Sequence, residues 1–494
     1  MKPNNLPSAA DLIFLFVAPI AAITGSVRMT QSDGDLAAHI RMGEVIMADG
    51  RIPVHSLASY TASSDFMVAH GWLSEIIFAA LFSIGGLPLL SVFTGIVIGL
   101  THALIALFLR KRGLDSRWAL IAALMSLALA STHWLTRPHM FSIVGAMVTM
   151  ILLESANPRR NVLFVPLFAL WANLHGGWLY GLTMIGAYIA GSIVEALISD
   201  GERSEWLRRA RRDSVGLLLA SAATLLNRYG LTVHREVLSA VTSSSLASNI
   251  SEFLAPDFQE LLQIPFLLAL LSTIGLFALG TRRIQLPRLI LILVSVFFAL
   301  RSYRNIALFG VSAWLLIAMH VAESIPPRKK PFRFFGEFAR LDPRSRVGIL
   351  AIPTAVLLVM IGLNRGAVGG RQLIPDSFSA KAFPTAAVEK ARAAGLRGRV
   401  FEAWRWGGYI MYAWPEARLH VDPLKFNATT IKSYGIIDDL DPGWQQELDR
   451  WQVRTIIINP ESRMAKGLAM EPKWKEWYRD STAVVYRPSA DAGI

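Results

Sequence analysis

Two aspartates, Asp33 and Asp35, flank a glycine just after the first long apolar run of the chain. A carboxylate can act as a general base, taking a proton from a hydroxyl or amine that is about to attack another molecule. The apolar run is long enough to enter a bilayer, so both acids are expected where the chain leaves the membrane. These residues therefore predict catalysis at a membrane surface, although Asp-Gly-Asp is also an ordinary turn sequence.

The same acids are candidate metal ligands. Asp33 and Asp35, with the neighbouring His39, could offer oxygen and nitrogen ligands to Mg²⁺ or Mn²⁺. The sequence supplies no evident third carboxylate, so a divalent metal cofactor stays an open alternative. The chain has no cysteine, which excludes disulfides and thiolate metal sites.

The acids belong to a polar stretch, residues 30–70, that we interpret as the first external loop. Four apolar side chains recur there with roughly helical spacing, which predicts a short helix in the membrane interface, ended by Gly50 and Pro53. These apolar residues are Leu36, Ile40, Val45 and Met47. Candidate substrate-binding side chains in and just after the loop are His39, Arg41, His70 and Glu75.

Composition identifies the class of protein that must position these residues. Of 494 residues, 53% are hydrophobic and only 17% are charged, which is typical of a polytopic membrane protein. The net charge of +13 is attributed to Lys and Arg retained in cytoplasmic loops. No nucleic-acid partner is expected.

Apolar segments predict about eleven membrane spans. The first, about residues 11–29, is expected to be retained and not cleaved as a signal peptide. A helix over residues 71–86, broken after Gly85 and Gly86, is too short to cross and is predicted to be re-entrant or interfacial. The other spans are predicted near residues 87–109, 117–134, 139–155, 162–174, 176–197, 214–229, 260–280, 286–300, 304–322 and 347–363.

Clusters of basic residues orient these spans. They include Arg110 to Arg112, Arg159 and Arg160, Arg208 to Arg212, Arg282 and Arg283, and Arg328 to Arg333. Placing all of them inside puts the N-terminus in the cytoplasm and the residues after 363 outside. We therefore expect a multi-pass protein of a bacterial plasma membrane with an extracytoplasmic C-terminal domain.

On this topology, polar residues from several connections gather on the outer face, including a second long external loop at residues 231–259. Ionisable groups near a membrane are costly, so their convergence predicts a polar pocket, although each residue alone could be an interfacial anchor. Arginine is suited to phosphate because its guanidinium donates two hydrogen bonds in a fixed fork. The candidate substrate-binding residues are Arg137, His139, Asn173, His175, Glu252, Arg301, Tyr303, Arg304 and Asn305.

The sequence divides into a membrane domain, residues 1–363, and a soluble α/β domain, residues 364–494. Within the latter, strands are predicted at residues 398–402, 417–421, 454–458 and 483–487, and helices at 403–413 and 443–451. The chain contains no P-loop, HExxH or GxSxG motif.

The layout resembles that of GT-C-fold membrane glycosyltransferases, which include protein O-mannosyltransferases, the lipid A aminoarabinose transferase and the catalytic subunit of oligosaccharyltransferase. The motifs that carry this resemblance follow Asp33 and Asp35 along the chain. They are Gly50-Arg51-Ile52-Pro53, Ser59-Tyr60-Thr61, His70-Gly71-Trp72-Leu73-Ser74-Glu75, Arg137-Pro138-His139, the stretch from Trp171 to Gly177, Trp406-Gly407-Gly408-Tyr409 and Val421-Asp422.

The resemblance implies an enzyme that moves a sugar from a polyprenyl-phosphate donor to a glycan, lipid or protein acceptor, with inversion at the anomeric carbon. By the same resemblance, Asp35 or Asp33 would be the catalytic base. Two positions depart from the family pattern: Gly71 stands where many relatives have an acid, and Arg228 where proline is usual.

Two alternatives belong to other functional classes. A noncatalytic scaffold would use the outer domain to bind a cell-envelope partner. A lipid or sugar transporter would place its polar residues near the middle of the bilayer and often contains internal repeats, neither of which is evident in this sequence.

Overall fold

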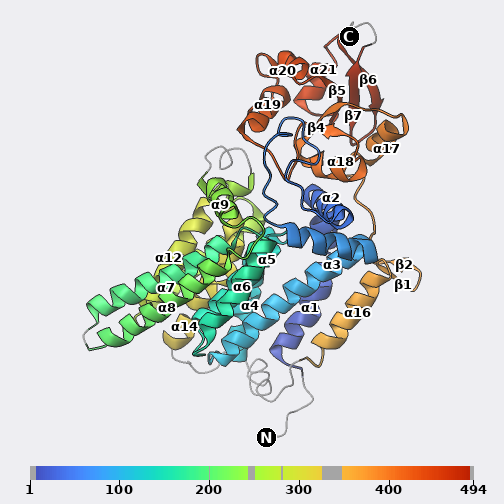
Figure 1. The fold of residues 1–494 in the computed structure, drawn as a ribbon. Helices are drawn as coiled ribbons and strands as arrows, with labels where there is room; N and C mark the ends of the chain where they lie inside the picture. Colours follow the sequence, from blue (N-terminus) through green and yellow to red (C-terminus); the bar gives the residue numbers. More distant parts are fainter. Residues whose placement is uncertain (1–6, 200, 243–250, 280–281, 325–347, 490–494) are drawn as a thin grey trace. The chain divides into compact units, whose positions relative to one another are not determined.

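The computed structural model is mainly helical, with a five-stranded sheet and a two-stranded hairpin toward the C-terminus (Figure 1). This confirms the predicted fold class, a helical membrane-type chain with a C-terminal α/β region. The predicted basic cluster from Arg328 to Arg333 lies outside the described part of the chain. The structure describes residues 7–199, 201–242, 251–279, 282–324 and 348–489.

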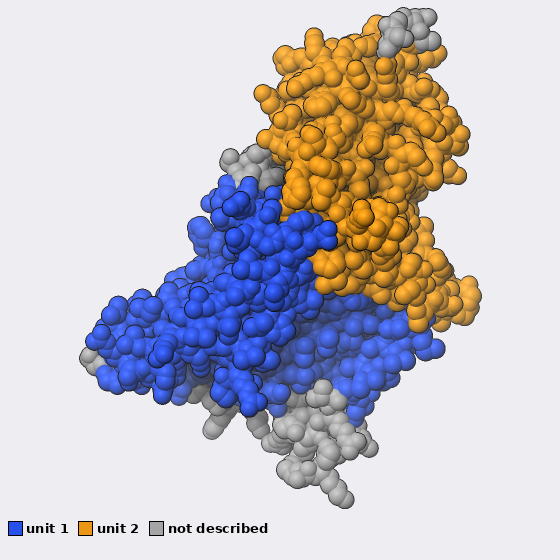
Figure 2. All heavy atoms as spheres, viewed as in Figure 1, with its two compact units in different colours: residues 1–24, 91–362 blue, residues 25–90, 363–494 orange. Residues whose placement is uncertain are grey.

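The chain forms two compact units, coloured separately in Figure 2. We call residues 1–24 and 91–362 the helical unit, and residues 25–90 and 363–494 the mixed unit. The first external loop thus belongs to the same unit as the C-terminal sheet. The predicted division at residue 363 separates a membrane domain from a soluble domain, and it stays a prediction.

The predicted apolar segments of the helical unit each contain a helix. The long helix α3 (Trp72–Lys111) begins in the mixed unit and ends in the helical unit. The other helices are α1 (Ala9–Ile23), α4 (Ser116–Ala130), α5 (Met140–Leu153), α6 (Arg160–Leu174), α7 (Trp178–Ile198), α8 (Arg203–Ala223), α9 (Leu231–Thr242), α11 (Ile264–Leu279), α12 (Leu286–Arg301), α13 (Ile306–Val311), α14 (Ala313–Ser324) and α16 (Ala351–Leu363).

Several of these helices could cross a membrane. Three described stretches are long and apolar enough by themselves, namely Trp72–Lys111, Trp178–Ile198 and Leu261–Ala278. The pair Tyr303–Val311 and Ala313–Ser324, bent by 43°, would make a fourth if it is one broken span. Other apolar helices are shorter, so the count of about eleven spans stays a prediction.

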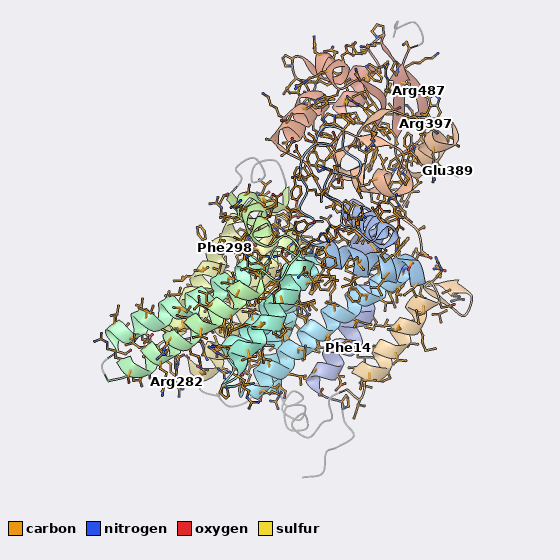
Figure 3. All side chains as sticks on the ribbon, viewed as in Figure 1. Phe14, Arg282, Phe298, Glu389, Arg397 and Arg487 are labelled. Carbon is orange, nitrogen blue, oxygen red and sulfur yellow. The ribbon has the colours of Figure 1, made fainter. Side chains whose placement is uncertain are left out.

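Small residues let α1 and α3 approach closely. A side chain on Gly95 would put its Cβ 2.6 Å from the carbonyl oxygen of Ala18, and one on Gly99 would lie 2.8 Å from the Ala18 Cβ. Gly95 and Gly99 are four residues apart and therefore share one helix face, the spacing common between membrane helices. The buried ring of Phe14, labelled in Figure 3, fills the neighbouring space on α1.

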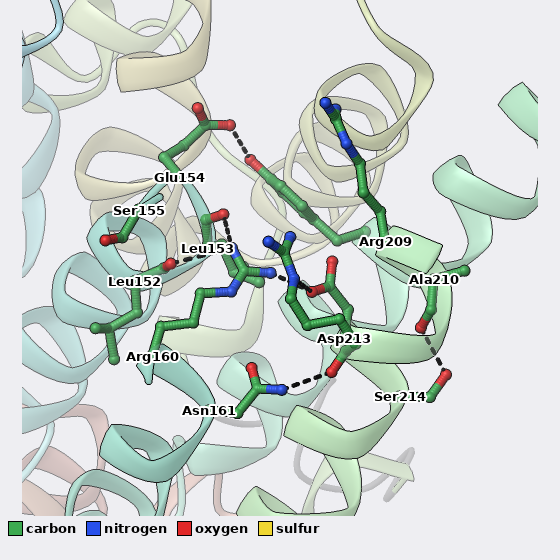
Figure 4. Close-up of polar contacts among 12 residues, drawn as sticks. Leu152, Leu153, Glu154, Ser155, Arg160, Asn161, Arg209, Ala210, Asp213 and Ser214 are labelled. Atoms are coloured by element: carbon green, nitrogen blue, oxygen red, sulfur yellow. Dashed lines mark hydrogen bonds and ion pairs between the residues drawn. The ribbon is translucent and has the colours of Figure 1, made fainter. Parts of the chain in front are cut away.

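A buried polar network fastens the ends of several helices (Figure 4). Arg160 at the start of α6 pairs with Asp213 of α8, and their side chains are 1% and 2% exposed. Glu154, just after α5, accepts hydrogen bonds from Tyr188 of α7 at 2.6 Å and from Arg288 of α12 at 2.8 Å. A buried charge is tolerated only when paired in this way, so the network is expected to fix the register of these helices.

The basic residues around position 210 were expected in a loop, but this prediction is wrong. Arg208, Arg209, Arg211 and Arg212 lie inside α8, which begins at Arg203. Acidic neighbours make a charged helix possible, because Glu205 and Asp213 form ion pairs with the nearest arginines.

The mixed unit contains a five-stranded sheet with the order β4-β3-β5-β7-β6. Strand β3 pairs in parallel with β4 and β5, whereas β7 runs antiparallel between β5 and β6. The strands are β3 (Arg399–Glu402), β4 (Arg418–Leu419), β5 (Val453–Ile458), β6 (Trp474–Arg479) and β7 (Val484–Pro488), beside a separate hairpin of β1 (Ala367–Val368) and β2 (Arg371–Gln372). The helices are α2 (Gly34–Asp49), α17 (Thr385–Ala393), α18 (Gly407–Ala413), α19 (Ala428–Asp438), α20 (Trp444–Arg450) and α21 (Arg463–Leu468).

The sheet carries a hydrophobic core on each face because its side chains alternate. Ile457 belongs to one core together with Trp406, while Ile456 and Ile458 belong to the other together with Met464. The predicted strands and the helix near residue 444 are confirmed. The predicted helix over 403–413 begins as a 3₁₀ turn, η7, before α18.

Residues of the first external loop extend this sheet. Ser59 forms a parallel bridge with Leu419 of β4. The backbone N–H of Tyr60 donates to the Leu419 carbonyl at 3.0 Å, and the Leu419 N–H donates to the Ala58 carbonyl at 2.9 Å. The loop therefore covers the edge of β4.

Helix α3 is broken where the sequence predicts. Gly85 and Gly86 leave the helical conformation, and Gly86 has a φ of 64° that favours glycine. After the break, the N–H of Leu87 donates to the Asp376 carboxylate at 2.9 Å. The break is confirmed, while the re-entrant or interfacial placement of residues 71–86 stays a prediction.

Candidate functional site

The two acids lie at the start of α2 in the mixed unit. Asp33 is the N-cap residue, and its carboxylate accepts a hydrogen bond from the N–H of Asp35 at 3.2 Å. Asp33 is 3% exposed, whereas Asp35 in the first helical turn is partly exposed. A helix N-terminus stabilises both carboxylates. Asp33 thus has a structural task, and Asp35 is the acid better placed to meet another molecule.

The backbone between the acids is clamped against α18. A Cβ on Gly34 would lie 2.5 Å from the carbonyl oxygen of Arg405, and one on Gly408 would lie 2.1 Å from the carbonyl oxygen of Gly34. Both positions therefore require glycine. The segment around Gly408 is in direct contact with the segment that carries Asp33 and Asp35.

His39 lies one helical turn after Asp35 and faces α3. Its Nδ1 is 3.3 Å from Oε1 of Glu75, and the two side chains are 13% and 5% exposed. The ring of Phe78 stands edge-on to the imidazole, with 6.4 Å between ring centroids. The structure therefore brings together two of the residues predicted to bind substrate, His39 and Glu75.

The other two predicted residues of this region, Arg41 and His70, make contacts of their own. Arg41 forms an ion pair with Glu44 on the partly exposed side of α2, at 3.3 Å. His70 lies in the turn before α3, where its N–H donates to the Val68 carbonyl at 2.8 Å.

A cluster of buried polar residues lies against the first external loop. Glu402 accepts hydrogen bonds from the N–H groups of His420 and Val421 at 3.0 and 2.8 Å. Burial raises the pKa of Glu402 well above its usual value and lowers the pKa of His420 to about 3. The Tyr60 hydroxyl lies 2.9 Å from Nδ1 of His420, and burial raises the pKa of that hydroxyl.

Further hydrogen bonds join the loop to the same cluster. The Ser56 hydroxyl donates to the Asp422 carboxylate at 2.6 Å. The hydroxyls of Ser59 and Thr61 donate to the carbonyl of His420 at 3.1 and 2.8 Å. Burial raises the pKa of Asp422. These contacts make the loop and the sheet one structural element.

The helical unit gathers basic residues from separate connections. Nη1 of Arg137, just before α5, donates to Glu252 at 3.1 Å, so two predicted binding residues form a pair. The Ser302 hydroxyl donates to the Glu252 carbonyl at 2.8 Å. The guanidinium of Arg137 is therefore already paired with an anionic group, the Glu252 carboxylate.

Arg304 lies beside the same segment. Its guanidinium lies over the Phe253 ring, 4.7 Å from the ring centroid. The Tyr303 N–H donates to the carbonyl of Leu254 at 2.9 Å. Arg137, Glu252, Tyr303 and Arg304 thus converge around one short stretch of chain.

Two predicted histidines adjoin each other in this unit. Nε2 of His139 lies 2.9 Å from the His133 carbonyl, and the rings of His139 and His175 stand edge-on with 6.4 Å between centroids. The Gly177 N–H donates to Nδ1 of His175 at 3.1 Å, and Ser142 contacts the same nitrogen at 2.7 Å. Because Nδ1 accepts, the neutral imidazole of His175 carries its proton on Nε2.

The remaining predicted residues make structural contacts. Nδ2 of Asn173 donates to the carbonyls of Ala169 and Leu226 at 2.8 and 2.9 Å, joining the ends of α6 and α8. Asn305 donates to the Phe298 carbonyl at 3.1 Å, and Arg301 is exposed at the end of α12.

Metal binding by a large ligand cluster is not evident in the described ranges, which contain no group of three or more His, Asp or Glu side chains able to hold an ion. Several supporting residues could not be predicted from the sequence. The importance of Gly34 and Phe253 comes from contacts with distant segments, which local patterns do not reveal.

Sequence comparison identifies neither a matching family model nor a matching curated protein. The fold, by contrast, matches solved structures. The archaeal oligosaccharyltransferase AglB from Archaeoglobus fulgidus, in complex with an inhibitory peptide and a dolichol-phosphate, has a TM-score of 0.55 and 14% identity, covering 98% of this chain and 74% of that chain. ArnT from Cupriavidus metallidurans, bound to undecaprenyl phosphate, has a TM-score of 0.51 and 13% identity, covering 97% and 98%.

The arabinofuranosyltransferase AftD from Mycobacteria also matches, with a TM-score of 0.50 and 11% identity over 98% of this chain and 40% of that chain. This chain has the GT-C fold. The expected resemblance is therefore confirmed at the level of the fold. Because a fold can host several activities, this likeness does not by itself assign a reaction to the chain.

Proposed function

We propose that this GT-C protein is a glycosyltransferase that moves a sugar from a polyprenyl-phosphate donor to an acceptor, with Asp35 as the general base. The observation that carries the proposal is the fixed acid at the start of α2 in a chain of this fold. Two solved relatives in fold contain a dolichol-phosphate and undecaprenyl phosphate, which supports a lipid-linked donor. The acceptor would be a glycan, a lipid or a protein.

Each residue has a defined part in this proposal. Asp35 takes the proton of the acceptor as its oxygen or nitrogen attacks the anomeric carbon. In the helical unit, Arg137 and Arg304 are the groups suited to hold the phosphate of the lipid donor by charge and by hydrogen bonds. The Nε2–H of His175 is an additional donor, with its orientation fixed by Ser142. A single displacement of this kind inverts the anomeric centre.

The proposal includes the predicted membrane arrangement. The chain would cross a bacterial plasma membrane several times, with its N-terminus in the cytoplasm and residues 30–70 and 364–494 outside. Membrane lipids would then surround the apolar helices, and Asp35 would meet its acceptor outside the cell membrane.

A transfer assay tests the assigned base. Full-length protein in lipid nanodiscs would be offered a panel of undecaprenyl-phosphate-linked hexoses and pentoses, together with a glycolipid extract as acceptor. Asp35→Asn should lower kcat by at least about 100-fold because it removes the proton acceptor. Asp33→Asn should chiefly lower the melting temperature, since Asp33 caps α2.

Measurements of donor binding distinguish the role of the base from the role of the phosphate-binding arginines. The double variant R137A/R304A should lose affinity for undecaprenyl phosphate, whereas D35N should keep it. Transfer at the wild-type rate by D35N and by the D33N/D35N double variant would exclude the assigned base.

The scaffold alternative requires an outer domain that acts independently. The edge of β4 is covered by residues 58–60, and Asp422 is satisfied by Ser56. Removing the first loop would expose that edge and a buried carboxylate. These contacts favour a C-terminal domain that positions the loop over one that serves as a separate binding module.

A further inference from the structure

The pair of His39 and Glu75 contains a buried carboxylate, that of Glu75, which has no role in the reaction proposed above. Glu75 is 4% exposed, and its Oε2 has no hydrogen-bond partner in the part of the chain that the structure describes. A buried carboxylate oxygen without a partner is costly, so it is expected to have a task beyond packing.

The hydrogen bond between the two residues fixes the imidazole. An ionised carboxylate only accepts, so Nδ1–H of His39 donates to Oε1 of Glu75 across 3.3 Å. In the neutral ring, the lone pair is then on Nε2. A carboxylate that holds a histidine in this way selects the tautomer and stabilises the imidazolium when the ring gains a proton.

Packing holds the pair rigidly. A Cβ on Gly43 would lie 2.0 Å from the carbonyl oxygen of Glu75, so α2 and α3 touch at their backbones. Gly43 is one helical turn after His39, and Phe78 is one turn after Glu75. The two helices therefore cross beside the imidazole, and its ring has little freedom to turn.

The same face of α2 carries Asp35. Residues four apart on a helix are neighbours, with about 5–6 Å between their Cβ atoms. Asp35, His39 and Gly43 follow one another at this spacing. Asp35 and His39 are thus close enough to exchange a proton directly or through one water molecule.

Other ionisable groups lie on the elements that pack against α2. They are Glu75 of α3, Tyr409 and Tyr412 of α18, and Arg405 of η7. Of these, Glu75 contacts the imidazole. Tyr412 interacts electrostatically with Glu44 and Arg41 on α2.

We propose that Asp35 passes the proton of the acceptor on to Nε2 of His39, and that Glu75 is the positioning residue for this transfer. This inference rests on the proposed function. As the acceptor oxygen bonds to the anomeric carbon, the bond from that carbon to the phosphate oxygen breaks, and the phosphate leaves with the electron pair. The proton moves from the acceptor to Asp35 and then to His39, which becomes an imidazolium beside Glu75 and later releases the proton to water.

Kinetics of the full-length protein test the relay. Glu75→Gln should lower kcat about 100-fold with little change in KM, because the imidazolium loses its partner. H39Q should lower kcat to a similar extent, again with little change in KM. E44Q is the matched control, since it removes the other carboxylate that pairs with a basic side chain on α2, and it should leave kcat and KM unchanged.

A second measurement does not depend on transfer. With ¹⁵N-labelled histidine, the ring nitrogens of His39, assigned by the loss of their signals in H39Q, should report a neutral ring with its proton on Nδ1, and E75Q should lose this preference. If D35N is inactive while E75Q and H39Q keep the wild-type rate, the relay is overturned and the proposed function stands. An unchanged His39 tautomer in E75Q would also overturn the relay, whereas a wild-type protein that transfers no sugar would count against the proposed function itself.

Discussion

Replacing Gly408 by alanine offers the sharpest test of how the C-terminal domain acts on the acids. The added Cβ would lie 2.1 Å from the carbonyl oxygen of Gly34 and 3.2 Å from the Cβ of Ala38. An ordinary contact needs more than 3 Å, so the two backbones must separate by about 1 Å. Overpacking of this kind costs about 1–3 kcal/mol, although alanine alone would favour the helix by about 1 kcal/mol over glycine.

The expected effect on activity exceeds the effect on stability. Gly34 lies between Asp33 and Asp35, and a displacement of about 1 Å in a catalytic group can lower the rate about 100-fold. We therefore expect G408A to fold, with a net loss of stability of at most about 2 kcal/mol, and to transfer sugar about 100-fold more slowly.

The measurements are thermal unfolding and initial transfer rates of the full-length protein in nanodiscs. Gly435 in α19 is the matched control, because a Cβ there would have no neighbour within 4 Å. G435A should be neutral or slightly stabilising and fully active. If G408A matches G435A in both stability and rate, the clamp between α18 and α2 does not position the acid.

Two further predictions follow from other contacts. E252Q should bind undecaprenyl phosphate up to about fivefold more tightly in a direct binding assay, because Arg137 loses a competing anion worth about 1 kcal/mol or less; weaker binding would show that Glu252 helps to hold the donor. The low pKa of His420, about 3 against an ordinary 6.5, means that the unfolded chain takes up a proton over that range while the folded chain does not. The contribution of His420 to stability should therefore fall as the pH falls from 6.5 toward 3, and H420N should remove this contribution; parallel stability curves of H420N and the wild type from pH-dependent thermal unfolding would contradict this explanation.

Local patterns predicted much of the architecture. Helix α2 ends at Asp49 and is followed by Gly50 with a φ of 62°, as the sequence indicated. Leu36 and Ile40 are fully buried, but Met47, expected on the same apolar face, is 45% exposed. The α2 pattern was imperfect, and it did not reveal that the helix packs against both α3 and α18.

Long-range contacts could not be predicted from the sequence. The bridge between Ser59 and Leu419 joins two short, irregular stretches, so neither shows a strand pattern. Strand β6 lies at the sheet edge, and its aromatic residues Trp474, Trp477 and Tyr478 do not alternate with polar ones, so the period of two typical of a strand is missing. The pairing of Arg137 with Glu252 likewise depends on the meeting of two loops, which spacing along one segment does not reveal.

The mixed unit is assembled from two stretches of chain separated by nearly all of the helical unit. During synthesis at about 5–20 residues per second, the segment with Asp35 leaves the ribosome long before α18 and β4 exist. Until those elements arrive, the N–H of Tyr60 and the hydroxyl of Ser56 lack the partners that they have in the finished protein. The acid-bearing loop can therefore mature only after translation is nearly complete, so a chain that stops early would carry Asp35 but not the conformation that makes it useful.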